Sequence, residues 1–352
     1  TFNGDIIDVL KPLYVAKSDR VTEWVVFTVQ DSDNEERWYV GSMSRIYPDG
    51  KWKIEDPKEV FTTNKNKKNE RLPSAQAMFE ANSKKTKKIE RHSGTEDPKA
   101  AMKMLSEKGS GNIDRYALRP MLGKDIVENK LVPDKNGKKV KKRVFNEKRL
   151  NYPVYVQRKL NGVHVLVFWD KNAKKVVLMS RTGLIFTVFG HIEETLEPWF
   201  RKYPDVVLNG ELYHHDTEVW TFQALSGITR KQKIADLNKK QKKALPKISV
   251  NLFDYLDLNE MDRGYDARMD AAENELGPFL DELDADEEYN PIDILEYFEV
   301  SSKKEIDKTY KHFLKQGYEG AMIRNDMPYI FGKRVSDRLF KYKPQFDDEF
   351  KL

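Results

Sequence analysis

The chain of 352 residues carries 62 Lys and Arg against 57 Asp and Glu, a formal net charge of +5, with 39% hydrophobic and 11% aromatic residues. These contents suffice for a buried core and argue against global disorder, and the length fits two or three domains. The absence of cysteine excludes disulfides, thiol catalysis and thiolate metal sites, so any metal must bind oxygen or histidine.

The first 72 residues are predicted to form a small β-rich module. Strand patterns occur at 23–29 and 37–41, and Pro48-Asp49-Gly50 is typical of a turn. From 73 to 118 the sequence is rich in Ala, Lys and Glu, which predicts one or two amphipathic helices, interrupted near Gly94 and Pro98. We interpret this second segment as a basic helical linker with a joint at 109–111.

The remainder, 119–352, is predicted to form one α+β domain. Strand patterns occur at 154–156, 162–168, 176–179, 184–189, 206–208, 249–256 and 320–324, and helix patterns at 191–203, 267–282 and 303–316. The segment around Asn136-Gly137, which precedes them, is interpreted as a basic loop. No apolar run approaches the roughly 20 residues of a transmembrane helix. No signal-peptide pattern is present, so we expect an intracellular protein, in a bacterial cytoplasm or at a nuclear or viral replication site, and not a secreted one.

Basic residues are concentrated in three segments, at 65–91, 130–149 and 230–247. An acidic segment at 281–299 contains no basic residue, so the small net charge hides an uneven distribution. Any one of these segments is as typical of an exposed lysine-rich surface as of a binding surface. Three of them together favour a polyanionic partner such as nucleic acid.

The most informative stretch for chemistry is Gln157-Arg158-Lys159-Leu160-Asn161-Gly162-Val163-His164. Lys159 lies between two strand patterns, and Asn161-Gly162 predicts a tight turn directly after it. This arrangement can hold an amine at the mouth of a pocket, ready to attack a phosphorus or carbonyl centre. By itself, a lysine beside an Asn-Gly turn is common and indicates no particular chemistry.

Five further motifs follow in the same domain: Ser180-Arg181-Thr182-Gly183, Leu208-Asn209-Gly210-Glu211, Val250-Asn251-Leu252-Phe253-Asp254-Tyr255, Glu319-Gly320-Ala321-Met322-Ile323-Arg324 and Leu339-Phe340-Lys341-Tyr342-Lys343-Pro344. In order, residue type and spacing, the series resembles the nucleotidyltransferase motifs of ATP-dependent polynucleotide ligases, and most closely those of DNA ligases. The resemblance covers residues 120–352.

This resemblance implies an ATP-grasp-like ligase adenylation fold with antiparallel sheets and flanking helices. It implies an ATP-dependent DNA ligase that seals 5′-phosphate/3′-hydroxyl nicks through a covalent lysine–AMP intermediate and an adenylated DNA 5′-phosphate. The implied cofactors are ATP and Mg²⁺, with Mn²⁺ as a substitute. The implied partner is nicked duplex DNA, bound by a monomer with no membrane attachment, and the implied processes are DNA replication, repair and recombination.

The resemblance also implies roles for single residues. Lys159 is the adenylated nucleophile, and Lys341 and Lys343 stabilise charge on the α-phosphate. Glu319 is the best candidate for a Mg²⁺ ligand through water, with Glu211 as a second metal candidate.

Further residues are implied to bind the nucleotide. Gln157 is expected to contact the adenine edge and Phe253 the adenine face, although ordinary core packing also explains Phe253. Glu211 is expected to accept hydrogen bonds from the ribose hydroxyls. Arg181 is expected to hold the ribose or the 5′-phosphate of the nick, and His164 a phosphate or the ribose.

Three residues depart from the ligase pattern, which has Asp, Arg and Asp where this chain has Asn161, His164 and Asn209. An amide keeps the size and one acceptor of a carboxylate but loses its charge, and a histidine lacks the bidentate fork of arginine. Asp254, Arg268, Arg324 and Arg334 occupy charged positions of the pattern, yet structural ion pairs explain them equally well. Two adjacent strand residues point to opposite faces, so His214-His215 is not expected to bind a metal.

Two expectations concern the ends of the chain. Family ligases continue into a C-terminal OB-fold domain, which we expect to be missing here through truncation. The N-terminal module, with Gln76-Ala77-Met78-Phe79-Glu80-Ala81 after it, faintly resembles the WGR-like module of some viral and phage ligases and is a candidate DNA-binding module.

Three alternatives share parts of this chemistry or fold. An RNA ligase would join RNA strands, and an mRNA-capping-type guanylyltransferase would use GTP in place of ATP. An inactive nucleic-acid-binding module would keep the fold, with the amide replacements as the sign of lost turnover. Incubation with labelled nucleotide separates two of them: label from GTP indicates the guanylyltransferase, and no covalent adduct indicates the binding module. Label from ATP leaves the choice between DNA and RNA as the strand that is joined.

Overall fold

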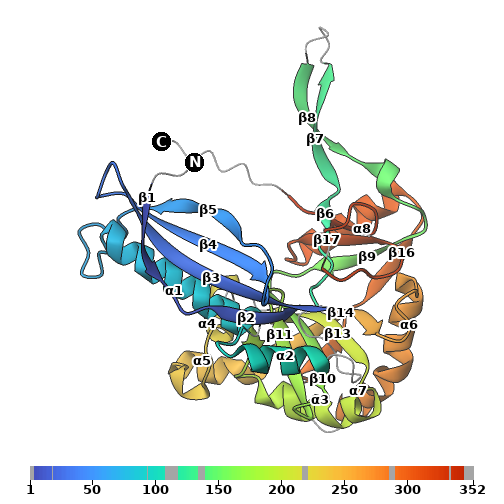
Figure 1. Cartoon of the computed structure of the whole chain (residues 1–352). Coiled ribbons are helices and arrows are strands. Elements are labelled where there is room, and N and C mark those ends of the chain that lie inside the picture. The colour runs from blue at the N-terminus through green and yellow to red at the C-terminus, as the bar shows by residue number, and fades with distance from the viewer. Residues whose placement is uncertain are drawn as a thin grey trace. The chain divides into compact units, whose positions relative to one another are not determined.

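The computed structural model describes residues 4–17, 19–92, 94–107, 118–133, 139–215, 221–284, 290–332 and 334–344, and it divides into two compact units, Thr1–Tyr116 and Ala117–Leu352 (Figure 1). The joint predicted at 109–111 and the Asn136-Gly137 pair lie outside the described residues. No helix of the described part is long and apolar enough to cross a membrane.

The first unit is an antiparallel sheet with helices. Its strands are β1 (Gly4–Val9), β2 (Leu13–Lys17), β3 (Arg20–Asp31), β4 (Trp38–Ile46) and β5 (Lys53–Val60). The order is β1-β3-β4-β5, and β2 pairs with the first half of β3, so β1 and β2 lie along the same side of the long β3. The helices are α1 (Pro73–His92) and α2 (Pro98–Glu107), as the alanine-rich segment predicted.

Helix α1 contributes to the core of the first unit. Ala77 and Ala81, one helical turn apart, are fully buried in one cluster with Trp24 and Val40. The link between α1 and α2 is tied to β2, because the backbones of Tyr14 and Thr95 exchange hydrogen bonds of 2.7 and 3.0 Å. The segment interpreted above as a linker therefore packs, through its small side chains, as part of the N-terminal unit.

The second unit contains two main sheets. The six-stranded sheet has the order β12-β11-β10-β13-β14-β15 and consists of β10 (Val163–Asp170), β11 (Lys175–Ser180), β12 (Ile185–Phe186), β13 (Val206–Tyr213), β14 (Ser249–Asp257) and β15 (Ile292–Ile294). The five-stranded sheet has the order β16-β9-β17-β18-β6 and consists of β6 (Lys124–Asp125), β9 (Val154–Lys159), β16 (Tyr297–Val300), β17 (Gly320–Asn325) and β18 (Leu339–Tyr342). All neighbours are antiparallel except β14–β15 and β18–β6.

Helices flank these sheets: α3 (Gly190–Lys202), α4 (Phe222–Thr229), α5 (Lys239–Ala244), α6 (Tyr265–Glu275), α7 (Gly277–Asp284) and α8 (Lys303–Lys315). The six-stranded sheet shares a core with α3 and α6, whereas α8 packs Ile306 and Phe313 against the five-stranded sheet. The expected α+β class, with largely antiparallel sheets and flanking helices, is confirmed.

Three predicted elements differ from the structure. The helix expected at 267–282 is two helices, because Pro278 cannot continue α6 but fits the first turn of α7. The strand expected at 184–189 is only Ile185–Phe186, since helix α3 begins at Gly190. The basic segment before β9, interpreted as a loop, forms an antiparallel hairpin of β7 (Val127–Pro133) and β8 (Lys139–Phe145).

Candidate active site

Lys159 lies at the end of β9 and faces Glu319, directly before β17. The two strands are antiparallel with Gly320 opposite Lys159, and the Glu319 N–H donates to the Lys159 carbonyl at 3.1 Å. Lys159 Nζ donates to Glu319 Oε2, and Lys343 Nζ donates to Glu319 Oε1 at 3.0 Å. One carboxylate therefore holds two of the three predicted catalytic lysines in one place.

Gly320 allows this close approach of strands. Its φ is +154°, and an added Cβ would lie 2.3 Å from the carbonyl oxygen of Tyr342 on β18. A side chain would therefore push β18 away, together with the residue that follows it, Lys343. The Glu-Gly pair of the motif thus supplies a carboxylate and the space for the strand that brings a lysine to it.

Lys341 is the third predicted catalytic lysine, and it lies on β18 opposite Met322. Burial lowers the pKa of Lys341 below its ordinary value, Asp125 opposes this effect, and the charges of Lys159, Arg334 and Lys343 add to it. These effects show that Lys341 shares the electrostatic environment of Lys159. The first and last of the sequence motifs, which lie far apart along the chain, therefore meet at one cationic cluster.

The two predicted carboxylates of the site differ in their electrostatics. Burial raises the pKa of Glu211 to about 7, although the charge of Lys159 and the Gly162 N–H act in the opposite direction. Burial also acts to raise the pKa of Glu319, but its hydrogen bonds and ion pairs with Lys159 and Lys343 outweigh this and lower it. Glu319 is thus the stable anion, and Glu211 titrates near neutral pH.

Glu211 also fixes the turn after the nucleophile. The Gly162 N–H donates to Glu211 Oε1 at 2.8 Å, and a Cβ on Gly162 would lie 2.3 Å from the carbonyl oxygen of Leu212. Only glycine therefore lets the turn lie this close to β13. The turn predicted from Asn161-Gly162 connects β9 to β10 and places Lys159 beside Glu211.

His164 and Asn209, two of the departures from the ligase pattern, contact each other. His164 Nε2 lies 2.9 Å from Asn209 Oδ1, and Asn209 Nδ2 donates to the Tyr329 hydroxyl at 3.1 Å. Since the Asn209 amide donates through its nitrogen, its oxygen must accept, which assigns the proton to His164 Nε2. The Tyr329 hydroxyl also accepts from the Met121 N–H at 2.8 Å, which anchors the network to the backbone.

This assignment leaves His164 Nδ1 as an acceptor. Nδ1 is buried and has no hydrogen-bond partner among the residues that the structure describes. Burial lowers the pKa of His164 to about 4, with the Arg181 charge acting in the same direction, so the ring is neutral at physiological pH. An unpaired buried acceptor on the residue opposite Glu211 suits a ligand that supplies a donor there.

Gln157 and Phe253 are predicted to contact adenine, and the structure places both in protein contacts. Gln157 is buried, its Nε2 donates to the Leu295 carbonyl at 3.1 Å, and its Oε1 accepts from Arg324 Nε at 3.3 Å. Phe253 is the extra residue of a bulge in β14, which turns its ring toward His164, with the centroids 5.9 Å apart. Their roles toward adenine stay predictions.

Asp254 forms a buried ion network beneath the site. It accepts from Arg268 Nε at 2.7 Å and Nη2 at 3.1 Å, and from Arg324 Nη1 at 3.2 Å, and all three side chains are at most 3% exposed. Arg324 in turn donates to Gln157 on the nucleophile strand. Asp254, Arg268 and Arg324 therefore form structural ion pairs. Through Arg324 they connect β14 to the nucleophile strand β9.

Arg181 is the last of the predicted site residues. Arg181 is exposed just after β11, and its charge acts on the pKa of both His164 and Glu211, which places it at the rim of the site.

In the His214-His215 pair, His215 Nδ1 lies 3.0 Å from the Tyr213 hydroxyl, and the His215 ring packs on Tyr318. Among the described residues no group of three or more His, Asp or Glu side chains could hold a metal.

Comparison with family models identifies the protein family. Residues 136–343, more than half of the chain, match the model of the ATP dependent DNA ligase domain. The chain belongs to the ATP-dependent DNA ligase family. Comparison with curated proteins gives no match.

Several solved structures are similar to this ligase domain. The structure named Pmar-Lig_PreS3 is 23% identical with a TM-score of 0.48, and the alignment covers 70% of this chain and 50% of that one. The ATP-dependent DNA ligase from bacteriophage T7 in complex with ATP is 19% identical, with coverage of 66% and 70% and a TM-score of 0.49. The Chlorella virus DNA ligase-adenylate is 17% identical, with coverage of 64% and 67% and a TM-score of 0.46. The chain spans half or less of the two Pmar-Lig chains.

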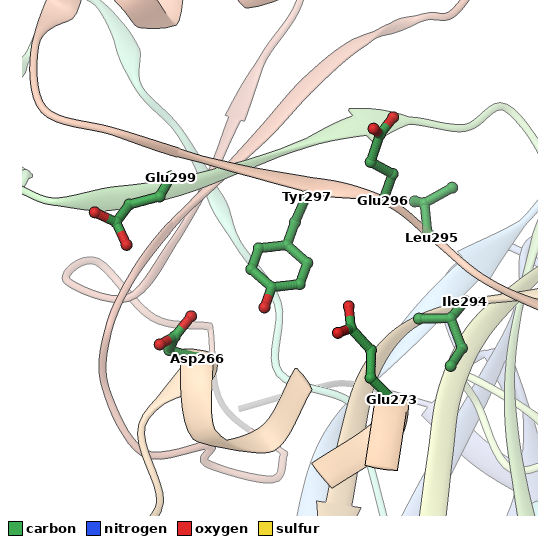
Figure 2. Close-up of a pocket in the computed structure, with 7 residues that line it drawn as sticks. All are labelled: Asp266, Glu273, Ile294, Leu295, Glu296, Tyr297 and Glu299. Carbon is green, nitrogen blue, oxygen red and sulfur yellow. The ribbon is translucent and has the colours of Figure 1, made fainter. Parts of the chain in front are cut away.

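The ligase domain also contains an acidic cavity of about 570 Å³ near β16. Figure 2 shows its lining residues, Asp266, Glu273, Ile294, Leu295, Glu296, Tyr297 and Glu299. Tyr297 points from its strand toward helix α6, which carries Asp266 and Glu273 (Figure 2). Four carboxylates repel a polyphosphate, so this cavity does not compete with the lysine cluster as a nucleotide site.

Two contributors to the ligase site had no signal in the sequence. Tyr329 orients Asn209 and lies between recognised motifs, in a segment without helical or strand periodicity. Asp125 borders Lys341 from the edge strand β6, which is only two residues long. Both act through contacts between distant parts of the chain, which spacing along the sequence does not encode.

Proposed function

We propose that this protein is an ATP-dependent DNA ligase whose Lys159 carries AMP during the reaction, and that it seals 5′-phosphate/3′-hydroxyl nicks in duplex DNA. The observation that carries the proposal is that Lys159 and Lys343 both bind Glu319, and that Lys341 lies close enough for the charges of these two lysines to lower its pKa. A cationic cluster on rigid strands suits a triphosphate and stabilises charge that develops on its α-phosphate. Family membership supports ATP as the nucleotide.

In the first step, Lys159 Nζ attacks the α-phosphorus of ATP. The Nζ–phosphorus bond forms as the bond from that phosphorus to the bridging oxygen of pyrophosphate breaks. Lys159 forms an ion pair with Glu319 in the structure, so its amine must leave this pair and lose a proton before attack. Lys343 also binds Glu319. When Lys159 leaves, Lys343 can stay paired with this carboxylate or bind the phosphates of ATP.

In the later steps, the AMP passes from Lys159 to the 5′-phosphate of the nick, and the 3′-hydroxyl oxygen then bonds to that phosphorus as AMP leaves. Arg181 at the rim is our candidate for holding the 5′-phosphate, because a guanidinium binds phosphate oxygens in pairs. His164 would accept a hydrogen bond from the nucleotide through Nδ1.

The carboxylates fit a magnesium ion that binds together with the substrate. Mg²⁺, with Mn²⁺ as a substitute, takes one or two protein carboxylates and completes its shell with water and phosphate oxygens. Glu319 and Glu211 are the residues that would hold it, since each interacts with Lys159 and their charges influence each other. When bound, the ion would supply positive charge against the phosphates.

We also propose that the N-terminal unit binds DNA. Lys65, Lys67 and Lys68 are exposed on the segment between β5 and α1, with no ion pair in the described part of the chain. Other lysines of the same basic segment have partners inside the unit, such as Lys85 with Glu96 at 2.6 Å. Replacing the three exposed lysines by Gln should weaken binding of nicked duplex, and unchanged affinity would contradict the proposal.

The reaction is tested by incubation with α-labelled ATP and Mg²⁺, followed by a denaturing gel. Label should stay on the wild-type protein and on Lys304→Ala, an exposed lysine on α8, and be lost in Lys159→Ala. A nicked duplex with a labelled 5′-phosphate should then be joined. Label from GTP alone would indicate a capping-type guanylyltransferase, joining of RNA strands only would indicate an RNA ligase, and no label would indicate an inactive binding module.

A further inference from the structure

The β7–β8 hairpin extends from the second unit as a separate two-stranded ladder (Figure 1). Its base is attached to β18, since the Ile126 N–H donates to the Lys341 carbonyl at 3.0 Å and the Asn146 N–H donates to the Ile126 carbonyl at 2.9 Å. Phe145 packs edge-on against Tyr342, with the ring centroids 5.2 Å apart. The hairpin is thus fixed to the strand that carries Lys341.

The register divides the hairpin into two faces. Residues opposite each other share a face, and faces alternate along each strand, so Leu131 lies with Lys141, and Lys130 lies with Lys142. We name the first the Lys141 face; its members are Val127, Asn129, Leu131, Pro133, Lys139, Lys141, Arg143 and Phe145. We name the second the Lys142 face; its members are Glu128, Lys130, Val132, Val140, Lys142 and Val144.

The two faces differ in their carboxylates. The Lys142 face contains Glu128, which binds Arg149 and Asn146 and lies 3.8 Å from Lys130. The Lys141 face contains Lys139, Lys141 and Arg143 and no acidic residue, and none of these three has an ion pair in the described part of the chain. One face of the hairpin therefore presents a row of positive charges without a counter-charge.

This arrangement costs stability in the free protein. Like charges at neighbouring positions on one face repel, and a two-stranded hairpin is only marginally stable in water. Lys139 and Lys141 are exposed, and Leu131, in register with Lys141, is 63% exposed. Three cations at two-residue steps, about 6.8 Å each, form a straight array that suits an equally regular row of anions.

We propose that the Lys141 face of the hairpin binds the sugar–phosphate backbone of duplex DNA. This inference rests on the proposed function, which makes duplex DNA the substrate. Lysines bind phosphates as point charges, and Leu131 can pack on sugar, so the contact carries no base specificity. The base of the hairpin is hydrogen-bonded to β18, the strand that carries Lys341. DNA bound to the hairpin would therefore have a fixed position relative to Lys341.

The test compares two variants of the full chain that each lose two charges from the hairpin. K139Q/K141Q changes the Lys141 face, and K130Q/K142Q is the matched control on the Lys142 face. Binding of a nicked duplex is measured from about 50 to 200 mM salt, and the slope of log K against log salt counts the phosphates contacted. K139Q/K141Q should lower the slope by about 1.8, at about 0.9 per phosphate, and the control by less than half as much.

Self-adenylation with labelled ATP separates this inference from the proposed function. Both variants should adenylate like the wild type, which also shows that they fold. If the wild type forms no adduct, the proposed function fails, while the slopes still decide the hairpin. Equal slopes for both variants would overturn the inference, because DNA binding would then not depend on which face of the hairpin loses its charges. A slope change with duplex RNA but not with duplex DNA would also overturn it.

Discussion

The two carboxylates of the site should respond to pH in opposite directions when each is replaced by glutamine. Burial raises the pKa of Glu211 from 4.5 to about 7, whereas Lys159 and Lys343 lower that of Glu319 in spite of its burial. Glutamine keeps the size of each side chain, and in Glu211→Gln the amide oxygen can still accept the hydrogen bond of the Gly162 N–H. The substitutions therefore isolate the charge.

The sign for Glu211 follows from proton linkage. A carboxyl with a raised pKa binds its proton more tightly in the folded chain, so its contribution to stability is complete below about pH 4.5 and is lost as the pH rises to about 7. The loss is about 3 kcal/mol. Near pH 8, Glu211→Gln should therefore raise the free energy of unfolding by about 3 kcal/mol, and this gain should vanish toward about pH 4.5.

Glu319 has the opposite sign. Its lowered pKa contributes stability that is present above its unfolded-state pKa of 4.5 and is lost as the pH falls through the folded-state value. Glu319→Gln should therefore be less stable than the wild type near pH 8, and this deficit should shrink in acid.

Urea unfolding, followed by the fluorescence of the buried Trp169 and Trp199 at about pH 5 and 8, measures both differences. A Glu211→Gln variant that is less stable than the wild type near pH 8 would refute the argument from burial.

Three further substitutions test contacts within the two units, two of them in the second unit and one in the first. Asp254→Ala leaves two buried guanidinium groups without their anion and should lower the free energy of unfolding by about 3–5 kcal/mol in the same urea assay; a loss under about 1 kcal/mol would contradict a buried network. Gly162→Ala places a Cβ 2.3 Å from the Leu212 carbonyl oxygen and should abolish self-adenylation, which normal labelling would disprove. Ala77→Leu overpacks the N-terminal core and should cost about 1–3 kcal/mol, whereas Thr86→Leu on the exposed side of α1 should change stability by less than about 0.5 kcal/mol; equal effects would show that α1 does not pack there.

The strands of the second unit were predictable where apolar runs are long. β10 and β14 carry enough buried Val, Leu and Phe to stand out, and both match the prediction within a few residues. The β7–β8 hairpin was not predicted because basic residues occupy four of the seven positions of β8, which removes the alternation that marks a half-buried strand. The remaining signal was Asn136-Gly137 between two runs of equal length, a typical hairpin turn.

The candidate site was predictable through its motifs and not through periodicity. Spacing along the chain does not reveal that Lys159 and Glu319 meet, because their contact depends on the pairing of β9 with β17. The order of the motifs pointed to the ligase family, and the resemblance to that family assigned Lys159 and Glu319 to one site. The contacts of Gln157 could not be predicted in this way, because its partner, the Leu295 backbone carbonyl, has no signature in residue type.

Two of the three departures from the ligase pattern contact each other. The pattern has an arginine and an aspartate where this chain has His164 and Asn209, and the two replacements lie 2.9 Å apart. Two residue types that carry charge in the pattern are thus replaced by two that are neutral here and lie within hydrogen-bond distance of each other, with Asn209 held in place by Tyr329. The exchange reverses the polarity offered to a ligand, because a guanidinium only donates, whereas His164 Nδ1 accepts. A group that binds at this position must therefore donate a hydrogen bond.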